Sequence, residues 1–246
     1  MEVFSSIIGL EDLNLGLELI LDHLVTWLFA FITIGFRCEI WSLSFSGFFI
    51  VKSFFLALSQ FSGSSLVFPT KFVWNSQVPF KVKSFVWLVA HKKVNTNDLI
   101  QLRRPYKALS PDICKLCMMH GESADHLFLH CSLTMGLWHR LFQIANMDWV
   151  PPRSISNMMY INYKGFSLSK RGIVLWQTAC IALIWVVWWE RNARIFEDKV
   201  RNSENLWDSI YFLASLWVFC SKVFKGIPFN VLQLDWLAVC SSNGLV

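Results

Sequence analysis

Four potential metal ligands lie close together in this chain, at Cys114, Cys117, His126 and Cys131. Their spacing is C-x2-C-x8-H-x4-C. A structural zinc ion takes four thiolate or imidazole ligands in a closed tetrahedron. The C-x2-C pair makes a tight turn that places two sulfurs on one side of the metal, and the histidine and the last cysteine close the other side. The spacing therefore predicts a CCHC zinc knuckle, with Zn2+ as the cofactor, that stabilises a fold rather than performs chemistry.

Two other histidines compete for the fourth ligand position. His130 is adjacent to the last cysteine, and two neighbouring side chains rarely reach one tetrahedral ion together. His120 is followed by ten residues before that cysteine, which matches no familiar zinc spacing. We therefore expect His126 to be the ligand; the alternative is that the thiols lie incidentally in a core. Glu122 and Asp125 are expected either to orient a ligand histidine or, more simply, to be exposed.

The other four cysteines are scattered, at Cys38, Cys180, Cys220 and Cys240. An odd total of seven, unevenly placed, argues against the disulfide framework of a secreted protein. The chain begins M-E-V-F-S-S, without a basic segment ahead of an apolar one, so no secretory signal is expected. These features predict an intracellular, reducing location, nuclear or cytoplasmic, in which the scattered thiols are small buried hydrophobes.

Composition and periodicity predict a mainly α-helical fold. The 246 residues are 54% hydrophobic, which is enough to build a core, and only 16% charged, so poor solubility or a missing partner is expected. Residues 40–50 alternate apolar and polar side chains around Ser46-Gly47, which predicts a small β-hairpin. Helical spacing or helix-start signals predict helices or single turns over residues 11–29, 51–59, 71–75, 80–92, 97–103, a segment from 131 through 142, 170–196 and 204–222.

Two apolar runs are candidates for membrane helices. Residues 24–36 are shorter than the roughly 20 residues that a span needs. Residues 173–189 are longer but include Gln177 and Thr178. We expect the second run to be a buried helix of an aromatic-rich core, so a membrane is an unlikely partner; a true span is the alternative.

Positive charge is concentrated around the motif. Residues 71–115 carry nine Lys or Arg and two acidic residues, a net charge of +7, whereas the rest of the chain carries −2. Such segments favour phosphate backbones through counterion release; the alternative is an ordinary solvated helix face. The aromatic residues Trp74, Phe85, Trp87 and Trp138 can stack on bases, but at helical spacing such residues more often belong to a core. The predicted nucleic-acid-binding residues are Lys81, Lys83, Lys92, Lys93, Arg103 and Arg104.

Three stretches carry a resemblance to a known family. They read FPTKFVWNSQVPFKVKSFVWL, then DICKLC, then DHLFLHC followed by a Leu-Trp pair. Together they resemble the zinc-binding domain found C-terminal to the reverse transcriptase of plant non-LTR (LINE-type) retrotransposons, over roughly residues 39–145. The later IWVVWWERNARIFEDK resembles the tail that often follows this domain. The resemblance also favours His126 as the histidine ligand.

The resemblance implies a division of the chain into four parts. Residues 1–38 match the family poorly, residues 39–150 form the zinc-binding domain, residues 151–169 are a polar linker, and residues 170–246 are a C-terminal helical tail. A reverse transcriptase needs paired aspartates to hold two divalent metals. This chain has no Asp-Asp dipeptide and no endonuclease-like cluster of Asp, Glu and His. It therefore resembles the C-terminal part of an element and is expected to be no enzyme.

Several functional hypotheses follow from these residues. The first is a zinc-stabilised module that binds RNA or DNA, and the second is a structural or protein-interaction module that packs against a reverse transcriptase polypeptide. A degenerate retroelement fragment without nucleic-acid binding is the third, and a protein anchored by residues 173–189 is the fourth. Salt-dependent binding to RNA separates the first hypothesis from the others.

Overall fold

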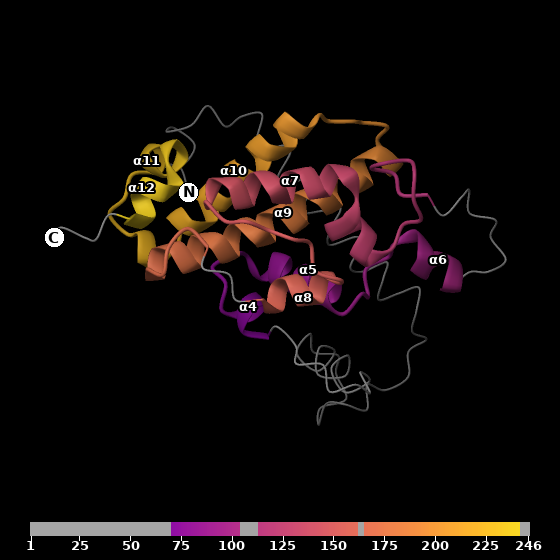
Figure 1. Cartoon of the computed structure of the whole chain (residues 1–246), viewed down its shortest axis with the longest axis horizontal. Coiled ribbons are helices and arrows are strands. Elements are labelled where there is room, and N and C mark those ends of the chain that lie inside the picture. Colours follow the sequence, from indigo (N-terminus) through magenta and orange to yellow (C-terminus); the bar gives the residue numbers. More distant parts are fainter. Residues whose placement is uncertain (1–69, 104–112, 162–164, 242–246) are drawn as a thin grey trace, which may run out of the picture. The chain divides into compact units, whose positions relative to one another are not determined.

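The computed structural model of the chain describes residues 70–103, 113–161 and 165–241, which are mainly helical (Figure 1). Within these ranges the β-structure is one antiparallel bridge, between Ile113 and Gly121. The mainly α fold class is therefore confirmed for this part of the chain. The elements are α4 (Thr70–Trp74), α5 (Phe80–Ala90), α6 (Asn97–Arg103), a π-helical turn η1 (His126–His130), α7 (Ser132–Ile144), α8 (Ile155–Tyr160), α9 (Lys170–Phe196), α10 (Ser203–Phe219), a 3-10 turn η2 (Lys222–Phe224), α11 (Phe229–Leu234) and α12 (Trp236–Ser241).

Several predictions fall on the N-terminal part of the chain, outside the described residues. They are the β-hairpin at 40–50, the helices at 11–29 and 51–59, and the apolar run at 24–36. These elements stay predictions. The boundaries of the four predicted parts of the chain also stay predictions, apart from what the structure shows of residues 151–169 below.

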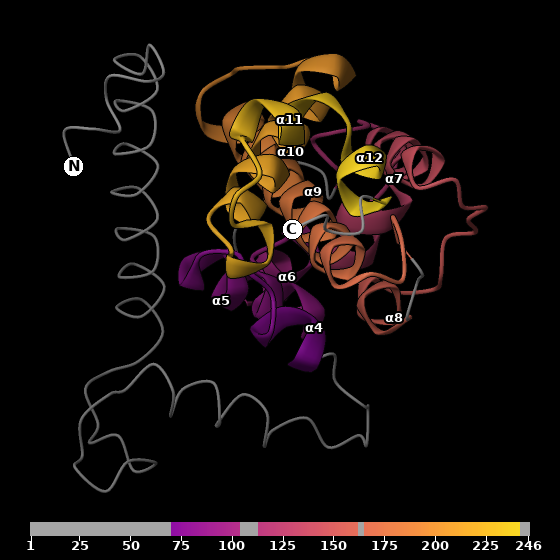
Figure 2. The ribbon, with the colours of Figure 1, turned by 90° about the vertical axis from the view of Figure 1, so that its left-hand side faces the viewer.

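Helix α9 lies at the centre of the described helices. Residues 179–184 in its middle are each at most 3% exposed. The helix packs against α10, α12, α5, α7 and η1, and Figures 1 and 2 both show it running between the indigo α4 and α5 on one side and α10 on the other. A helix that is apolar all round is stable where every side finds an apolar neighbour. This burial agrees with the prediction of a core helix over residues 173–189.

Among the described residues, α9 is also the helix that is long and apolar enough to cross a membrane. Its most apolar window is 67% buried inside the protein itself. Core helices pass the same test of length and composition, so the test alone is weak evidence for a span. The apolar surface that a bilayer would cover is mostly covered here by neighbouring helices.

Helix α5 follows the predicted start and ends two residues earlier than predicted. Pro79 precedes its first residue with φ −55°, a value that suits a helix entry. Lys92 has a left-handed φ of 54°. The N–H of Lys92 donates to the carbonyl of Val89, and the N–H of Lys93 donates to the carbonyl of Leu88, at 2.9 and 2.8 Å. This pair of hydrogen bonds is the Schellman arrangement that terminates a helix.

The segment predicted to be a linker, residues 151–169, contains helix α8. The hydroxyl of Ser154 caps the helix by accepting from the N–H of Asn157, and the buried residues of the helix are Ile155, Met158 and Met159. Helix α8 packs against α5. The prediction of a polar linker is therefore wrong for this helix, because three apolar side chains within the Ser- and Asn-rich sequence attach it to the core.

The C-terminal residues form two short helices around a buried tryptophan. Trp236 is 1% exposed and its ring stacks on Tyr211 of α10, with centroids 4.1 Å apart and planes within 5°. Its indole N–H donates to the hydroxyl of Ser215 at 3.0 Å. Gly226 and Pro228 separate this tail from α10, since α10 ends at Phe219 and α11 begins after the proline. The tail is thus part of the core.

Candidate metal centre and basic surface

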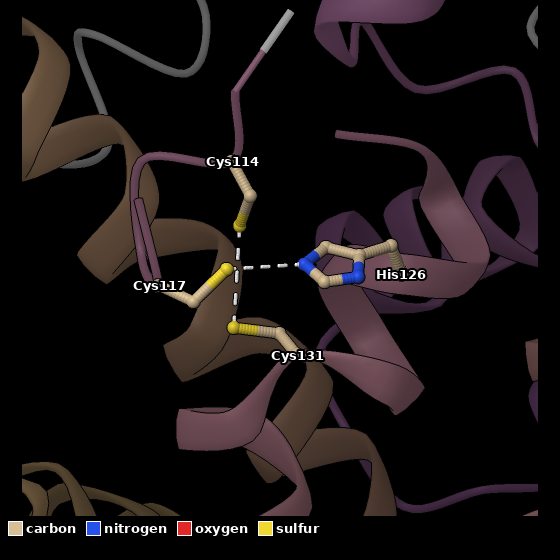
Figure 3. A group of neighbouring side chains, drawn as sticks. All are labelled: Cys114, Cys117, His126 and Cys131. Carbon is tan, nitrogen blue, oxygen red and sulfur yellow. Dashed lines mark hydrogen bonds between the residues drawn. The ribbon is translucent and has the colours of Figure 1, made fainter. Parts of the chain in front are cut away.

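The four predicted metal ligands lie together in the structure. Their donor atoms, three cysteine sulfurs and one histidine nitrogen, all lie within 4.8 Å of one another. Figure 3 shows the side chains of Cys114, Cys117, His126 and Cys131 pointing toward one common centre. The sulfur of Cys117 lies 3.3 Å from Nε2 of His126, and the sulfurs of Cys114 and Cys131 lie 4.0 Å apart. Residues 17 positions apart in the sequence are thus brought to one site.

These separations fit a tetrahedral ion. With metal–sulfur and metal–nitrogen bonds of about 2.3 and 2.0 Å, the edges of a zinc tetrahedron measure roughly 3.5 to 3.8 Å. The observed 3.3 and 4.0 Å lie on either side of that range. The cluster is therefore consistent with a bound metal ion that needs only small side-chain adjustments.

A tight turn positions the first two ligands. The N–H of Cys114 donates to the carbonyl of His120 at 2.7 Å, and the carbonyl of Cys114 accepts from the N–H of Met118 at 2.9 Å. Met118 has a left-handed φ of 55°. The bridge between Ile113 and Gly121 closes the base of this loop. The backbone thus folds the C-x2-C segment so that both sulfurs lie on one side of the site.

A π-helical turn positions the other two ligands. In η1 the N–H of Cys131 donates to the carbonyl of His126, five residues earlier, at 2.6 Å. Such turns hold one residue more than an α-helical turn and are frequent at functional sites. The N–H of His126 donates to the hydroxyl of Ser123 at 3.2 Å, which fixes the start of the turn. The H-x4-C spacing therefore brings both donors to the same side.

The protonation of the cluster suits a cation. The pKa of the Cys114 thiol is raised far above its ordinary value of 9.0, mainly by the hydrogen bond with Cys131 and secondly by burial. The same hydrogen bond lowers the pKa of Cys131. Burial, then the charges of His120 and His130, lower the pKa of His126, so the imidazole is neutral at pH 7. A divalent cation would displace the proton held between the two sulfurs, because metal ligands bind deprotonated.

The competing histidines and the acidic neighbours lie outside the donor cluster. His120 is exposed, and Nε2 of His130 lies 3.4 Å from the carbonyl of Arg153. Asp125 is partly exposed. Its carboxylate accepts from the N–H of Ile155 at 3.0 Å and pairs with Lys92, and neither of these partners is a ligand histidine.

Glu122 is a clear departure from expectation, because it is neither exposed nor bonded to a histidine. It is 2% exposed, and its carboxylate pairs with Arg191 of α9 at 2.7 Å. It also accepts from the backbone N–H of Asn97 at 3.0 Å. The side-chain oxygen of Asn97 in turn accepts from Arg191 at 3.0 Å. Glu122 therefore joins the metal loop to α6 and α9.

A second arginine of α9 supports the C-x2-C loop directly. Nη1 of Arg194 donates to the carbonyl of Leu116 at 3.0 Å. Its Nε donates at 2.7 Å to Glu190, whose side chain is fully buried. These two supports were not predicted from the sequence. The one available signal was the E-R-N-A-R run, which places charges at the end of an otherwise apolar helix.

The six predicted nucleic-acid-binding residues differ in their surroundings. Lys81 and Lys93 are exposed. Lys92 is half-exposed and pairs with Asp125. Nζ of Lys83 donates to the carbonyl of Trp74 at 3.1 Å, and burial lowers the pKa of this lysine. Arg103 is the last residue of α6, and its side chain, like all of Arg104, lies outside the described residues.

Most of the aromatic and cysteine predictions concern burial. Trp138 and Trp87 are 0% and 6% exposed, as the core interpretation predicts, whereas Trp74 and Phe85 are only partly buried.

Cys180 and Cys240 are buried as expected, and Cys38 lies outside the described residues. Cys220 is exposed, so the prediction that it is a buried hydrophobe is wrong. It directly follows the last residue of α10, where the chain turns at the surface.

Comparison with known proteins finds a zinc-binding family over the region that contains the four donors. Residues 49–138 match the family described as zinc-binding in reverse transcriptase, which confirms the resemblance over those residues. A "putative ribonuclease H protein" of Arabidopsis thaliana is 25% identical over 163 residues, which are 65% of this chain and 26% of that protein. The chain thus spans about a quarter of the length of this curated relative. No solved structure matches the chain.

Proposed function

We propose that this chain is a zinc-stabilised, non-catalytic module derived from the C-terminal part of a retrotransposon reverse transcriptase, and that it binds RNA or DNA. The observation that carries the proposal is the closed set of four donors, Cys114, Cys117, His126 and Cys131, within 4.8 Å of one another inside the matched family region. Three thiolates and one imidazole are a donor set typical of structural zinc. A set closed by four protein ligands leaves no open position for a substrate.

The metal is tested by elemental analysis of purified protein. We expect about one zinc ion per chain, and Cys117→Ser is expected to lose it because three donors hold zinc far more weakly than four. Cys220→Ser is the matched control, since this thiol is exposed and outside the cluster. Well-folded wild-type protein without zinc would contradict the proposal.

The basic surface supports the nucleic-acid part of the proposal. Lys81 and Lys93 are exposed and, among the described residues, neither pairs with a carboxylate. Reversing both to Glu should weaken binding to RNA and duplex DNA alike. Each phosphate contact adds roughly 0.7 to 0.9 to the slope of log affinity against log salt, so loss of two contacts should flatten the slope by about 1.4 to 1.8.

Titration of fluorescent RNA and duplex DNA at several salt concentrations measures this effect. Lys92 is left unchanged, because a Glu at that position would face Asp125. The control carries the same charge change elsewhere, at the exposed Lys222 and Lys225. Equal loss of binding in both double variants would mean that only net charge matters, and absence of binding to any nucleic acid would remove this part of the proposal.

We also propose that the chain is not catalytic, because the described part of the chain lacks the metal-binding carboxylates that a polymerase needs. Phosphoryl transfer by a polymerase needs carboxylates that hold two metal ions. Within the described ranges, the thiolate and imidazole cluster is the one group of three or more His, Cys, Asp or Glu side chains placed to hold a metal. We expect pure protein to extend no primer on any template; nucleotide incorporation abolished by a point mutation in this chain would contradict this.

A protein-interaction module is the second candidate function. It is favoured by two large apolar side chains exposed at the metal loop, Met118 and Met119, at 62% and 66%. Exposed methionines suit adaptable protein contacts. This candidate is preferred if the charge-reversed and wild-type proteins bind nucleic acid equally poorly, and the degenerate-fragment alternative if the purified protein also does not fold.

A further inference from the structure

One surface of the described part of the chain is built from segments without acidic residues. No Asp or Glu occurs in residues 70–97, which include α4 and α5, or in residues 149–189, which include α8 and most of α9. Helix α5 packs against α4, α8 and α9, so these segments are neighbours. We call the exposed residues of α4, α5, α8 and of the 170–189 part of α9 the acid-free face.

Among the described residues, one acidic side chain from another element forms an ion pair at the edge of the acid-free face. Asp125, which precedes η1, pairs with Lys92 just beyond the C-terminal end of α5. The N-terminal end of α5 lies roughly 15 Å away, at 1.5 Å per residue. The acid-free face is therefore most positive around the start of α5, where no described ion pair neutralises the lysines.

An exposed aromatic ring lies at this positive end. Phe80, the first residue of α5, is 59% exposed although it belongs to an apolar helix. Its ring centroid lies 5.9 Å from that of Trp74, which in turn lies 5.5 Å from the ring of the buried Trp87. The exposed ring thus contacts the partly buried Trp74, which in turn contacts the buried Trp87, and more than half of the Phe80 surface stays exposed.

Three lysines lie on the same two helices as the Phe80 and Trp74 rings. Lys81 follows Phe80 directly and is exposed. Nζ of Lys83, one turn further along α5, is held at 3.1 Å from the carbonyl of Trp74. Lys71 is exposed one turn before Trp74 on α4. An aromatic platform with flanking cations is the arrangement by which proteins hold single strands, because a base stacks on the ring while the phosphates meet the cations.

Another equally exposed phenylalanine lies at the end of α9, outside the acid-free face. Phe196, the last residue of α9, is 58% exposed and is followed directly by Glu197 and Asp198. It lies 19 residues after Gln177, whose side chain donates to the carbonyl of Phe72 in α4. This separation along α9 is about 28 Å. Phe196 therefore serves as a matched control for an exposed ring outside the acid-free face.

We propose that the acid-free face binds single-stranded nucleic acid, with a base stacked on Phe80 and neighbouring phosphates paired with Lys71 and Lys81. This inference rests on the nucleic-acid binding proposed above and names its substrate class. In a duplex the bases are stacked on one another and closed to the ring, so a duplex can use only the lysines. The ring should therefore contribute to binding of single strands and not to binding of duplexes.

The test measures the affinity of the full chain for a fluorescent single strand of about 15 nucleotides, as oligo-U and oligo-dT, and for a duplex of the same length. Phe80→Ala should weaken single-strand binding by roughly 5- to 150-fold and leave duplex binding unchanged. Phe80→Trp should keep single-strand binding, because indole also stacks. Phe196→Ala should change neither, and circular dichroism checks that each variant is folded.

Three other outcomes decide against the inference in different ways. If Phe80→Ala binds single strands as well as wild type does, while Lys81→Glu with Lys93→Glu binds them less well, binding uses phosphates alone and the stacking role is wrong. If Phe80→Ala weakens single strand and duplex equally, the ring acts through the fold or through a general contact. If wild type binds neither probe, the nucleic-acid part of the proposed function fails, and an acidic protein partner becomes the better occupant of the acid-free face.

Discussion

At the scale of single residues, Glu190 shows how a charge is stabilised inside this apolar protein. Its side chain is fully buried. It accepts from Nε of Arg194 at 2.7 Å, and from the backbone N–H and the Nε of Arg201 at 3.1 and 3.0 Å. Burial raises the pKa of this carboxyl, but the hydrogen bonds outweigh burial, so the pKa lies below its ordinary value of 4.5. The ionised form is therefore the one that the fold stabilises.

This depressed pKa predicts a pH dependence of stability. Because the folded pKa lies below the unfolded one, ionised Glu190 stabilises the fold above the unfolded value near 4.5, and this contribution is lost as the pH falls through the folded pKa. The difference in unfolding free energy between wild type and Glu190→Gln should therefore shrink at acid pH. Denaturant titrations at a series of pH values, with both proteins in the same metal state, measure it.

The matched control is Glu204→Gln. Glu204 also pairs with an arginine, Arg140, but its side chain is 66% exposed, and exposed pairs contribute little to stability. Its substitution should change stability little at any pH. A difference between wild type and Glu190→Gln that stays constant across the acid range would mean that the carboxylate charge is not the stabilising feature.

At the scale of elements, the metal loop depends on α9. Glu122 in the loop and Arg191 in α9 form an ion pair whose side chains are 0% and 4% exposed. Removing one partner of a buried pair leaves the other charge without compensation, which costs more than the pair contributes as a whole. The ion pair therefore fixes where the loop lies on α9, whatever its net contribution to stability.

The second prediction concerns this pair. Arg191→Met should lower the free energy of unfolding by about 3 to 5 kcal/mol and speed the loss of metal to a chelator, because it leaves Glu122 buried and unpaired. The double variant Arg191→Met with Glu122→Gln should lose less than the sum of the two single variants. Chemical denaturation of the four proteins gives this cycle, and strict additivity would show that the two side chains are not coupled.

At the scale of the whole molecule, the predicted zinc-binding domain and the predicted helical tail share one core. Helix α9 packs against α5, α7 and η1, and α10 packs against α7. Phe85 of α5 contacts Trp185 of α9, with ring centroids 5.3 Å apart at 81°. Side chains from both predicted parts thus bury one another, which two independent domains would not require.

The third prediction follows from this shared core. Removal of the metal should destabilise α9 and α10 together with the metal loop, so that thermal unfolding followed by helicity and by tryptophan fluorescence gives one transition that moves to lower temperature with chelator. Wild-type protein with and without chelator is the comparison, and Cys117→Ser should behave as the chelated protein does. Two separate transitions, with only the smaller one sensitive to chelator, would show that the tail folds by itself.

Local signals in the sequence predicted much of the candidate site. The spacing of Cys114, Cys117, His126 and Cys131 predicted which side chains meet, because a tight turn and one turn of helix need only neighbouring residues. Periodicity and helix-start signals likewise predicted helices at 80–92, 97–103 and 170–196, and the structure contains helices at Phe80–Ala90, Asn97–Arg103 and Lys170–Phe196. Local signals were insufficient where contacts with distant parts of the chain decide the structure. Part of the predicted linker forms helix α8, whose apolar side chains are buried against the core.

The sequence by itself determined the identity of the donor set and the positions of the helices, since both depend on residues close together in the chain. Only the tertiary structure decided what surrounds them. It paired Glu122 with Arg191, 69 residues away, and Lys92 with Asp125, 33 residues away. It also left Phe80 exposed beside the exposed Lys81. Burial and pairing depend on which distant elements meet, and no local pattern in a single sequence encodes that meeting.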